Sequence, residues 1–465
     1  MNSQNDEKRE LFEKTPVIKA LITLCIPTVI SQLIHLIYSL ADTFFVGRTG
    51  NPYMLAGVSL AFSLFIFGVP FANLFGIGGG SLIARMMGAG ETSEAKNVSA
   101  YSFWMGIIVS AAYSLVIFLF MEPILTLLGA SENTMLYARQ YTLLVVVCGT
   151  APTTVSNILA HLLRNTGYSK QASYGLSGGG ILNTILDPLF MFVIFPEGME
   201  VFAAALATLI SNILSCAYLA FELSRCAKRA PLSLSPSRAL KLSPVQKKNV
   251  FSVGFPSAVL PGLMDVSSFF LNSMMSAHGD LQMAAIGICM KAERLPNCIG
   301  LGISQGMLPL VAYNFASGNH KRMSDTIKTG RLIGIGTAAV CIILYELFAD
   351  RLCGLFMNTS GGAEAAAMTL AFATVFLRIR CLCSPFQFLN YHPSFCMQAM
   401  GDGRDTLIHA TVRVIIVYIP MMYLLDALLG QNGLAAAFPA SEAISAVLAN
   451  LLLFRWIKKE TAART

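Results

Sequence analysis

The sequence has very little charge for its length. Of its 465 residues, only 12% are charged and 55% are hydrophobic, whereas charged residues make up about a quarter of a soluble globular domain. This composition excludes an ordinary soluble protein. It makes the membrane span of about 20 apolar residues the natural unit of the chain.

Patterns for metal binding, disulfide bonding and catalysis are also missing. The 11 cysteines have neither zinc-ligand nor disulfide-framework spacing, so we interpret them as small apolar packing residues. The glycine-rich stretches 76–80 and 300–306 lack the lysine and preceding strand of a phosphate loop, and we expect them to serve close helix packing. No nucleophile is matched with a base. We therefore expect neither an ATP site nor an enzyme.

Twelve apolar segments are long enough to cross a bilayer. Backbone polar groups in lipid must be hydrogen-bonded within their own segment, so each segment is expected to be a helix. The ten-residue alternating segments of a membrane β-barrel are absent. The sequence therefore predicts an all-α membrane protein with twelve transmembrane helices. They span residues 17–46, 53–84, 97–121, 136–161, 171–195, 201–223, 249–276, 282–312, 327–349, 366–397, 405–427 and 433–455.

The basic residues predict the orientation. With the N-terminus in the cytoplasm, 24 of the 32 Lys and Arg residues lie on inside segments, and three (Arg48, Arg139 and Arg351) lie outside. This is a positive-inside distribution, which explains the net charge of +7 without nucleic-acid binding. We expect both termini to be cytoplasmic.

The two halves of the chain repeat one another. Pro27 corresponds to Pro256 and Asn157 to Asn390, with an offset that drifts only from 228 to 234 residues. Two copies with the same topology form a transporter architecture in which the binding site lies between the halves. We expect a cytoplasmic tail (1–16), a first lobe of six helices (17–223), a flexible basic cytoplasmic linker (224–248), a second lobe of six helices (249–455) and a cytoplasmic tail (456–465).

The most informative polar residues stand in the apolar stretch 181–192. Asn183 and Asp187 lie four residues apart, which places them on one face of a helix. Pro188 removes a backbone donor and loosens the helix beside the carboxylate. An ionisable group inside a span is costly, so a functional role is the first hypothesis. The alternative is a solvated helix end shortly before Pro196.

Span one carries a second carboxylate, Asp42. Tyr38 lies one turn before it on the same face, and His35 and Gln32 continue this polar stripe inward. A functional role is again the first hypothesis, because of the cost of a charge in the membrane. The alternative is that Asp42 ends the span near water.

Polar residues of two further spans could complete a cluster around these carboxylates. They are Asn157 in span four and Thr208 in span six. The alternative is that each bonds a neighbouring helix. For Asn157 the copy in Asn390 favours that structural role.

The duplication distinguishes residues that the scaffold needs from residues that are available for a specific function. The second lobe has Leu271, Val417 and Met421 where the first has Asp42, Asn183 and Asp187. The scaffold can therefore be built without these polar groups. Two carboxylates in one low-dielectric pocket cannot both ionise freely, so the site would bind a proton. Alternatively, the same carboxylate oxygens, together with Asn and Thr oxygens, could coordinate Na⁺. Either ion neutralises the site and couples ion occupancy to shape. We expect no other metal or cofactor.

The second lobe has three acidic residues of its own inside spans. Asp265, Glu293 and Glu442 lie in spans seven, eight and twelve, and Arg378, Arg380 and Arg413 are available to pair with them. Two interpretations remain open: buried ion pairs that hold helices together, or a site for a cationic substrate.

The chain resembles the multidrug and toxic compound extrusion (MATE) family along nearly its whole length. The likeness rests on the segments 41–47, 88–91, 163–167, 183–188 and 203–208, in this order within a repeat of six and six spans. The likeness is strongest to the bacterial multidrug efflux members, so we expect a place in the plasma membrane of a bacterium. The resemblance implies a V-shaped pair of six-helix bundles and export of organic cations in exchange for H⁺ or Na⁺. It also implies an ion-responsive site in the first lobe made of Asp42, Asn183, Asp187 and Thr208, with Tyr38 and Asn157 nearby.

The resemblance also bears on the second lobe and on partners. One branch of the family has a glutamate in span seven, where this chain has Asp265, and Glu293 stands in only by position. We take Asp265, Glu293, His35 and Gln32 as candidates for substrate binding. The expected partners are small organic cations or drugs and the lipid bilayer, with no required protein partner and a monomeric state. The alternatives are a lipid-linked oligosaccharide flippase of the same superfamily and a membrane scaffold without turnover.

Overall fold

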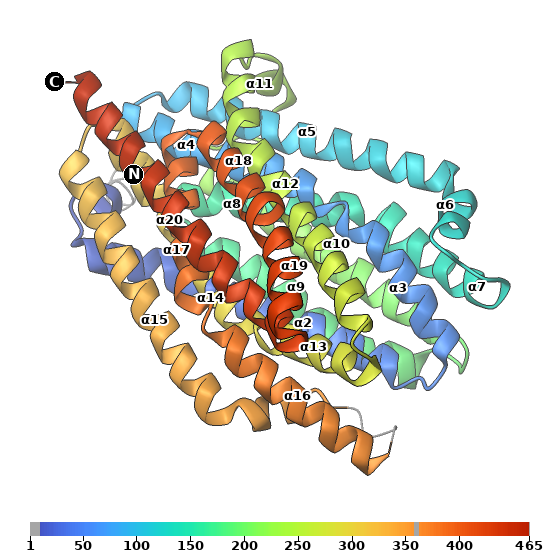
Figure 1. Ribbon diagram of the computed structural model, residues 1–465. Coiled ribbons are helices and arrows are strands. Elements are labelled where there is room, and N and C mark those ends of the chain that lie inside the picture. Colours follow the sequence, from blue (N-terminus) through green and yellow to red (C-terminus); the bar gives the residue numbers. More distant parts are fainter. Residues whose placement is uncertain (1–9, 358–361, 465) are drawn as a thin grey trace.

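The computed structural model describes residues 10–357 and 362–464. The side chains of Asp42, Thr43 and residues 460–464 lie outside this description. Within the described ranges the regular structure is helical (Figure 1). This agrees with the rule that a chain in lipid must satisfy its backbone hydrogen bonds locally.

The first lobe comprises α2 (Val17–Gly47), α3 (Pro52–Ile66), α4 (Val69–Ala89), α5 (Thr92–Leu119), α6 (Met121–Leu127), α7 (Glu132–Tyr141), α8 (Thr150–Asn165), α9 (Ser169–Leu189) and α10 (Glu200–Cys226). The second comprises α12 (Pro244–Ser276), α13 (Asp280–Ala292), α14 (Arg294–Ala316), α15 (His320–Gly354), α16 (Ala363–Cys381), α17 (Ser384–Met400), α18 (Gly403–Thr411), α19 (Ile419–Leu429) and α20 (Gln431–Arg464). Between them lies the short helix α11 (Pro236–Leu240).

The prediction of twelve spans is confirmed. In the described ranges, ten helical segments are long and apolar enough to cross a membrane. Two further helix pairs, bent by 41° and 45°, bring the number to twelve when each pair is one span. Three stretches are π-helical: Thr142–Cys148, Phe190–Ile194 and Val412–Tyr418. The second of these begins two residues after Pro188, in keeping with the local loosening that a proline causes.

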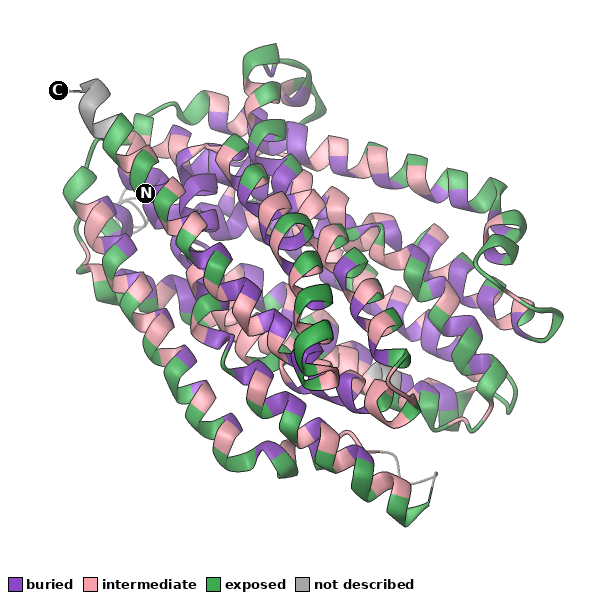
Figure 2. Ribbon diagram, viewed as in Figure 1, coloured by how far each residue is buried: buried purple, intermediate pink, exposed green. Residues whose placement is uncertain are grey.

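The surface of the bundle is apolar where it would meet lipid. Figure 2 shows exposed residues along the outer faces of the peripheral helices. On α2 the exposed residues include Ile18, Ile22, Ile26 and Ile30, all about half exposed and spaced by one turn. A stripe of this kind would be an aggregation hazard in water. On a multi-pass membrane protein it is the face that contacts the acyl chains.

The two lobes meet mainly along three helix pairs: α4 with α12, α2 with α14, and α4 with α14. A Cβ atom on Gly302 of α14 would lie 2.7 Å from the Cα atom of Val29 in α2. A Cβ atom on Gly254 of α12 would meet the backbone of Leu74 in α4. Glycine therefore permits this close approach between membrane helices. The prediction that residues 300–306 serve helix packing is confirmed.

The lobes are joined at the end of the molecule that carries both termini (Figure 1). Gly88, near the end of α4, lies against the backbone of Tyr313, near the end of α14. The carboxyl ends of these two helices from different lobes therefore pack together.

The N-terminal segment is docked rather than separate from the bundle. Phe12 is fully buried, and its ring stacks on Tyr313 of α14 with 5.0 Å between the ring centroids. Arg322 of α15 donates from Nε to the Phe12 carbonyl oxygen at 2.7 Å and from its Nη2 to the Leu11 carbonyl oxygen at 3.1 Å. The chain that leads into the first lobe is thus fastened to the second.

The linker 224–248 differs from the flexible segment that its sequence predicts. Its middle packs against α5, where Trp104 Nε1 donates to the Leu234 carbonyl oxygen at 2.9 Å. Leu232 and Leu242 are buried in the same core. These scattered apolar residues fix the linker, although its charges and prolines favour a mobile loop.

The glycine contact between α2 and α14 yields the first prediction. Gly302→Val places two methyl groups where there is no room for one carbon atom, so the lobes must separate or strain. We expect a loss of about 1–3 kcal/mol in stability, the usual cost of overpacking. Thermal unfolding in detergent micelles measures this loss.

The matched control is Gly336→Val on α15, where a Cβ atom meets nothing within 4 Å and the position is exposed. It should unfold at the wild-type temperature or slightly above. Equal unfolding temperatures for the two variants would contradict the role assigned to Gly302.

Candidate functional site

The first lobe encloses a polar cavity of about 240 Å³. It is bounded by α2, α4, α8, α9 and α10, and by one residue of the second lobe, Gln305 of α14. Oxygen- and nitrogen-bearing side chains dominate its wall. The lining residues are Ser31, Gln32, His35, Tyr38, Val69, Asn73, Thr153, Ser156, Asn157, His161, Arg164, Leu176, Gly179, Gly180, Asn183, Thr208, Asn212, Ser215 and Gln305. A cavity of this composition suits water, ions and polar ligands.

Three residues form an amide–carboxylate cluster at the wall of this cavity: Asn183, Asp187 and Thr208. The Asn183 Nδ2 group donates to Asp187 Oδ1 at 3.1 Å and to Thr208 Oγ1 at 3.2 Å. Asp187 is 0% exposed, and Asn183 and Thr208 are nearly as deeply buried. Asn183 and Thr208 face the cavity, and Asp187 lies directly behind them. The carboxylate is therefore in contact with the cavity wall and shielded from bulk solvent.

The sequence builds this cluster by helix spacing and small side chains. Asn183 and Asp187 share one face of α9 because they are four residues apart, as predicted. Thr208 reaches them from α10, where Ala203, Ala204, Ala205 and Ala207 are completely buried. Thr208 Oγ1 also donates to the Ala204 carbonyl oxygen at 3.0 Å, which fixes its rotamer.

The cluster contains one buried acceptor atom that no described donor reaches. The Asn183 Oδ1 atom is buried and accepts no hydrogen bond from any described residue. Such an oxygen normally has a partner. Together with Asp187 and Thr208 it presents several oxygen atoms from two helices, the ligand type that hard cations and protons seek.

The stripe predicted on span one also faces the cavity. Gln32, His35 and Tyr38 all line it. The rings of His35 and Tyr38 lie 5.1 Å apart. Asp42 belongs to α2 one turn beyond Tyr38, but its side chain lies outside the described residues. Whether it meets Asp187 thus stays a prediction.

Asn157 combines the two roles that the sequence left open. It lines the cavity, and its Nδ2 group donates to the Thr153 carbonyl oxygen at 2.9 Å within α8. That hydrogen bond uses one donor inside its own helix. The Oδ1 atom of Asn157 remains available to a ligand in the cavity.

Sequence reasoning missed a bridge between the lobes beside this cavity. Gln305 of α14 accepts at Oε1 from Gln32 Nε2 at 3.1 Å and from Arg164 Nη1 at 3.4 Å. Arg164 is buried, although its sequence position suggests a basic loop at the end of span four. Arg164 lies in segment 163–167, one of the segments that carry the family resemblance, and this could have marked it as more than a loop residue. Gln305 stands in a glycine-rich stretch that we interpreted as packing alone.

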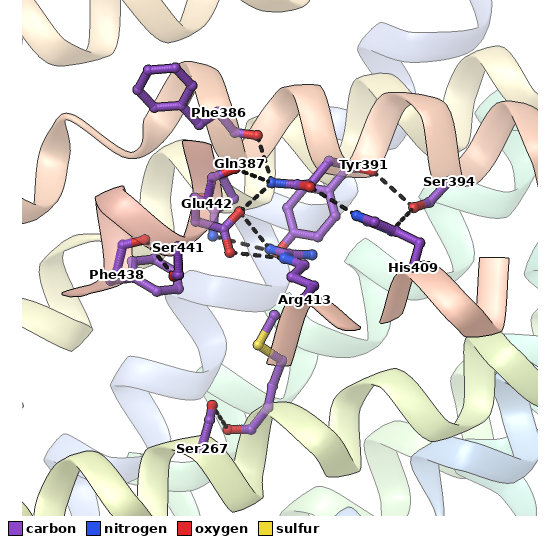
Figure 3. A network of polar contacts seen from close by, with 12 residues as sticks. Ser267, Phe386, Gln387, Tyr391, Ser394, His409, Arg413, Phe438, Ser441 and Glu442 are labelled. Carbon is purple, nitrogen blue, oxygen red and sulfur yellow. Dashed lines mark hydrogen bonds and ion pairs between the residues drawn. The ribbon is translucent and has the colours of Figure 1, made fainter. Parts of the chain in front are cut away.

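The second lobe contains a buried ion pair at the corresponding depth (Figure 3). Arg413 donates to the Glu442 carboxylate at 2.8 Å and 3.0 Å, and each side chain is 2% exposed. The Arg413 guanidinium also lies over the Tyr391 ring, 4.9 Å from its centroid. This bidentate geometry satisfies two charges that would be costly apart.

Hydrogen bonds extend the pair into a network. Asn390 Nδ2 donates to Glu442 Oε2 at 2.8 Å, and Asn390 Oδ1 lies 2.9 Å from His409 Nε2. His409 Nδ1 is 2.9 Å from Ser394 Oγ. Figure 3 shows His409 and Ser394 beside the pair. Every member has a partner, so the network joins α17, the span of α18 and α19, and α20 as one unit.

The duplication shows what part of this network replaces. At the offset of 234 residues that relates Asp187 to Met421, Arg413 corresponds to Gly179 of the same repeated span. Gly179 lines the first-lobe cavity. The second lobe therefore has a buried arginine where the first lobe has a glycine at the wall of its cavity.

The other two acidic candidates of the second lobe, Glu293 and Asp265, differ in their surroundings. Glu293 is held by Arg380 through two contacts of 2.7 Å, and Arg380 is 2% exposed. For Glu293 and Glu442 the structure supports the ion-pair interpretation. Arg378 pairs instead with Glu346 at the surface, at 3.9 Å. Asp265 is exposed on α12.

These features define a multi-pass α-helical membrane protein of two six-span lobes, in which one lobe holds a polar cavity and the other a closed network of ion pairs. The family model described as MatE matches residues 27–189 in the first lobe and 256–424 in the second. The chain therefore belongs to the MatE family, and the resemblance seen in its sequence is confirmed.

Individual relatives agree with this assignment. A curated protein of Staphylococcus saprophyticus, "Multidrug export protein MepA", is 30% identical over 450 residues, which cover 97% of this chain and 96% of the relative. A crystal structure of MATE in complex with MaL6 has a TM-score of 0.90 at 23% identity, covering 98% of this chain and 99% of that one. An outward-facing multidrug resistance MATE family transporter of the MOP superfamily has a TM-score of 0.88 at 23% identity, with 97% and 98% covered.

The buried pair in the second lobe yields the second prediction. Glu442→Gln leaves the Arg413 guanidinium buried without its counter-charge, which typically costs 3–5 kcal/mol. The variant should unfold at a markedly lower temperature in detergent. The control, Glu346→Gln, disturbs an exposed pair and should cost at most about 1 kcal/mol. A Glu442→Gln protein as stable as this control would show that the network does not hold the lobe together.

Proposed function

We propose that this protein is a secondary active transporter that exports small organic cations and drugs in exchange for H⁺ or Na⁺ by alternating access. The observation that carries the proposal is the buried carboxylate of Asp187, joined through Asn183 to Thr208 at the wall of a polar cavity. The name of the staphylococcal relative supports drug export as the activity.

The cluster is suited to a coupling cation. A proton on Asp187, or a sodium ion among oxygens of Asp187, Asn183 and Thr208, neutralises the carboxylate in a low-dielectric setting. The buried Asn183 Oδ1 atom without a hydrogen-bond donor supports this assignment. The cation is cargo, and the chain's own residues hold it while the lobe changes shape.

Alternating access follows from how the lobes are joined. The contacts between the lobes include close helix packing at glycines and the hydrogen bonds of Gln305 to Gln32 and Arg164. They join two bodies that share one buried core, while each also has a core of its own. We propose that ion occupancy of the cluster biases to which side of the membrane the polar cavity opens. We also propose that both termini face the cytoplasm of a bacterium and that the transporter works as a monomer.

The arginines of the second lobe do not support the flippase alternative. That alternative requires Arg378, Arg380 and Arg413 to line a cationic cavity. Arg380 and Arg413 are instead neutralised by Glu293 and Glu442, and Arg378 lies near the surface beside Glu346. Second-lobe arginines therefore do not favour an anionic lipid-linked substrate.

The third prediction tests the site. Asp187→Asn removes the charge that must bind the coupling ion and keeps the shape of the side chain. Efflux of ethidium from reconstituted vesicles should fall to the level of protein-free vesicles, while the variant still inserts into the membrane. Imposing pH and sodium gradients separately on the wild-type protein identifies the coupling ion.

The matched control is Asp350→Asn, an exposed carboxylate at the end of α15. It should transport at the wild-type rate. Full ethidium efflux by Asp187→Asn would overturn the assignment of the site. Absence of flux by the wild-type protein under either gradient would favour the scaffold alternative.

A further inference from the structure

A groove of about 750 Å³ runs along the outside of the second lobe, between α15, α17 and α20. It lies apart from the first-lobe cavity and shares no residue with it. Most of its lining is apolar. The lining residues are Met323, Ser324, Ile327, Lys328, Arg331, Phe386, Leu389, Ala443, Ala446, Val447, Asn450, Leu451, Leu453, Phe454 and Ile457.

The groove spans about one leaflet of the bilayer. On α20 it extends from Ile457 to Ala443, which is roughly 21 Å of helix at 1.5 Å per residue. One leaflet contributes about half of a 30 Å hydrocarbon core. Trp456, Lys458 and Lys459 stand at the Ile457 end, and these residue types mark the headgroup level.

Two cationic side chains interrupt the apolar wall. Lys328 and Arg331 lie one turn apart on α15. In the described part of the chain, neither forms an ion pair with an acidic residue. Even Asp325, which lies one turn before Lys328 on α15, forms no ion pair with either of them. The Arg331 Nε group is buried and donates to no described acceptor. Buried donors of this kind normally have a partner.

One further polar residue of the groove, Asn450, has a partner for its amide nitrogen but none among the described residues for its amide oxygen. Asn450 of α20 donates from Nδ2 to the carbonyl oxygens of Ala446 at 2.7 Å and Leu389 at 3.2 Å. Its Oδ1 atom is buried and accepts no hydrogen bond from a described residue. The groove thus offers positive donors and one amide acceptor within a long apolar channel.

We propose that this groove is a binding site for an anionic phospholipid, with the phosphate held by Lys328 and Arg331 and an acyl chain lying along α20. Basic pockets between membrane helices recognise acidic lipid headgroups in this way. An organic cation is disfavoured, since the two basic side chains repel it.

The site has a structural consequence for the second lobe. The groove brings together α15, α17 and α20, three helices that are separate in sequence. Near the same end, Arg322 of α15 holds the N-terminal segment, and the ring of Trp456 on α20 lies 5.2 Å from that of Phe315 on α14. A lipid that bridges α15 and α20 therefore stabilises the end of the lobe against which Leu11 and Phe12 are docked.

The test is native mass spectrometry of the purified full-length protein, titrated with dioleoyl-phosphatidylglycerol or dioleoyl-phosphatidylcholine in detergent. The wild-type protein should retain one phosphatidylglycerol and bind phosphatidylcholine more weakly. The double variant Lys328→Gln, Arg331→Gln should bind phosphatidylglycerol about 30-fold more weakly, because each basic residue contributes to binding independently. The control, Lys228→Gln with Arg229→Gln, removes the same two charges from exposed positions in the linker and should bind as wild type.

A second variant tests the apolar part of the site with the charges intact. Val447 is 62% exposed on α20 and lines the groove. Val447→Trp should occupy the space of the acyl chain and reduce phosphatidylglycerol retention while the protein stays folded. The proposal is overturned by any of three results: equal binding of the two lipids, equal losses in the Lys328/Arg331 variant and in the control, or displacement of the lipid by ethidium.

Discussion

The constraint on which this structure depends is that a charge inside a membrane must be neutralised. The second lobe meets it permanently, because Arg413 and Glu442 share two short contacts in a site that is closed to solvent. The first lobe has Gly179 at the position that corresponds to Arg413. Gly179 lines an open polar cavity together with Asn183, and Asn183 is hydrogen-bonded to the buried Asp187 carboxylate. In the proposed mechanism, one duplicated scaffold thus supports a rigid lobe and a lobe that responds to an ion.

This division explains why the duplication is informative. A bidentate buried pair resists separation, since removing either partner leaves an uncompensated charge. The second lobe is therefore suited to act as a rigid body in a rocking motion. The first lobe has an amide and a hydroxyl beside its carboxylate, and these groups can exchange partners at much lower cost. For this reason the proposed mechanism assigns the coupling between ion and shape to the first lobe, whose polar groups can rearrange.

Much of the fold was predictable because its signals are local. Apolar run lengths indicate the spans, and the repeat offset indicates two lobes, before any contact is known. The shared face of Asn183 and Asp187 also follows from spacing within one helix. The linker was the exception. A few buried leucines and one hydrogen bond from Trp104 to its backbone outweighed a composition that favours mobility.

Contacts between helices were much less predictable. Three arginines and three acidic residues allow many pairings, and a single sequence does not say which helices are neighbours. Arg378 has Glu346 as its partner, an acid that the sequence did not single out. Arg164 shows the same limit, because a basic residue at the end of a span also fits an ordinary inside loop. Its burial follows from packing among α8, α2 and α14, which no local pattern encodes.

The central claim is that Asp187 and its neighbours bind the coupling cation in a way that is linked to substrate binding. The most direct test is the dissociation constant of ethidium for the purified protein, measured at a series of pH values and sodium concentrations. The account predicts that affinity falls as the coupling ion becomes more concentrated, and that Asp187→Asn loses this dependence. An affinity that responds to neither ion, or a dependence that persists unchanged in the variant, would contradict it.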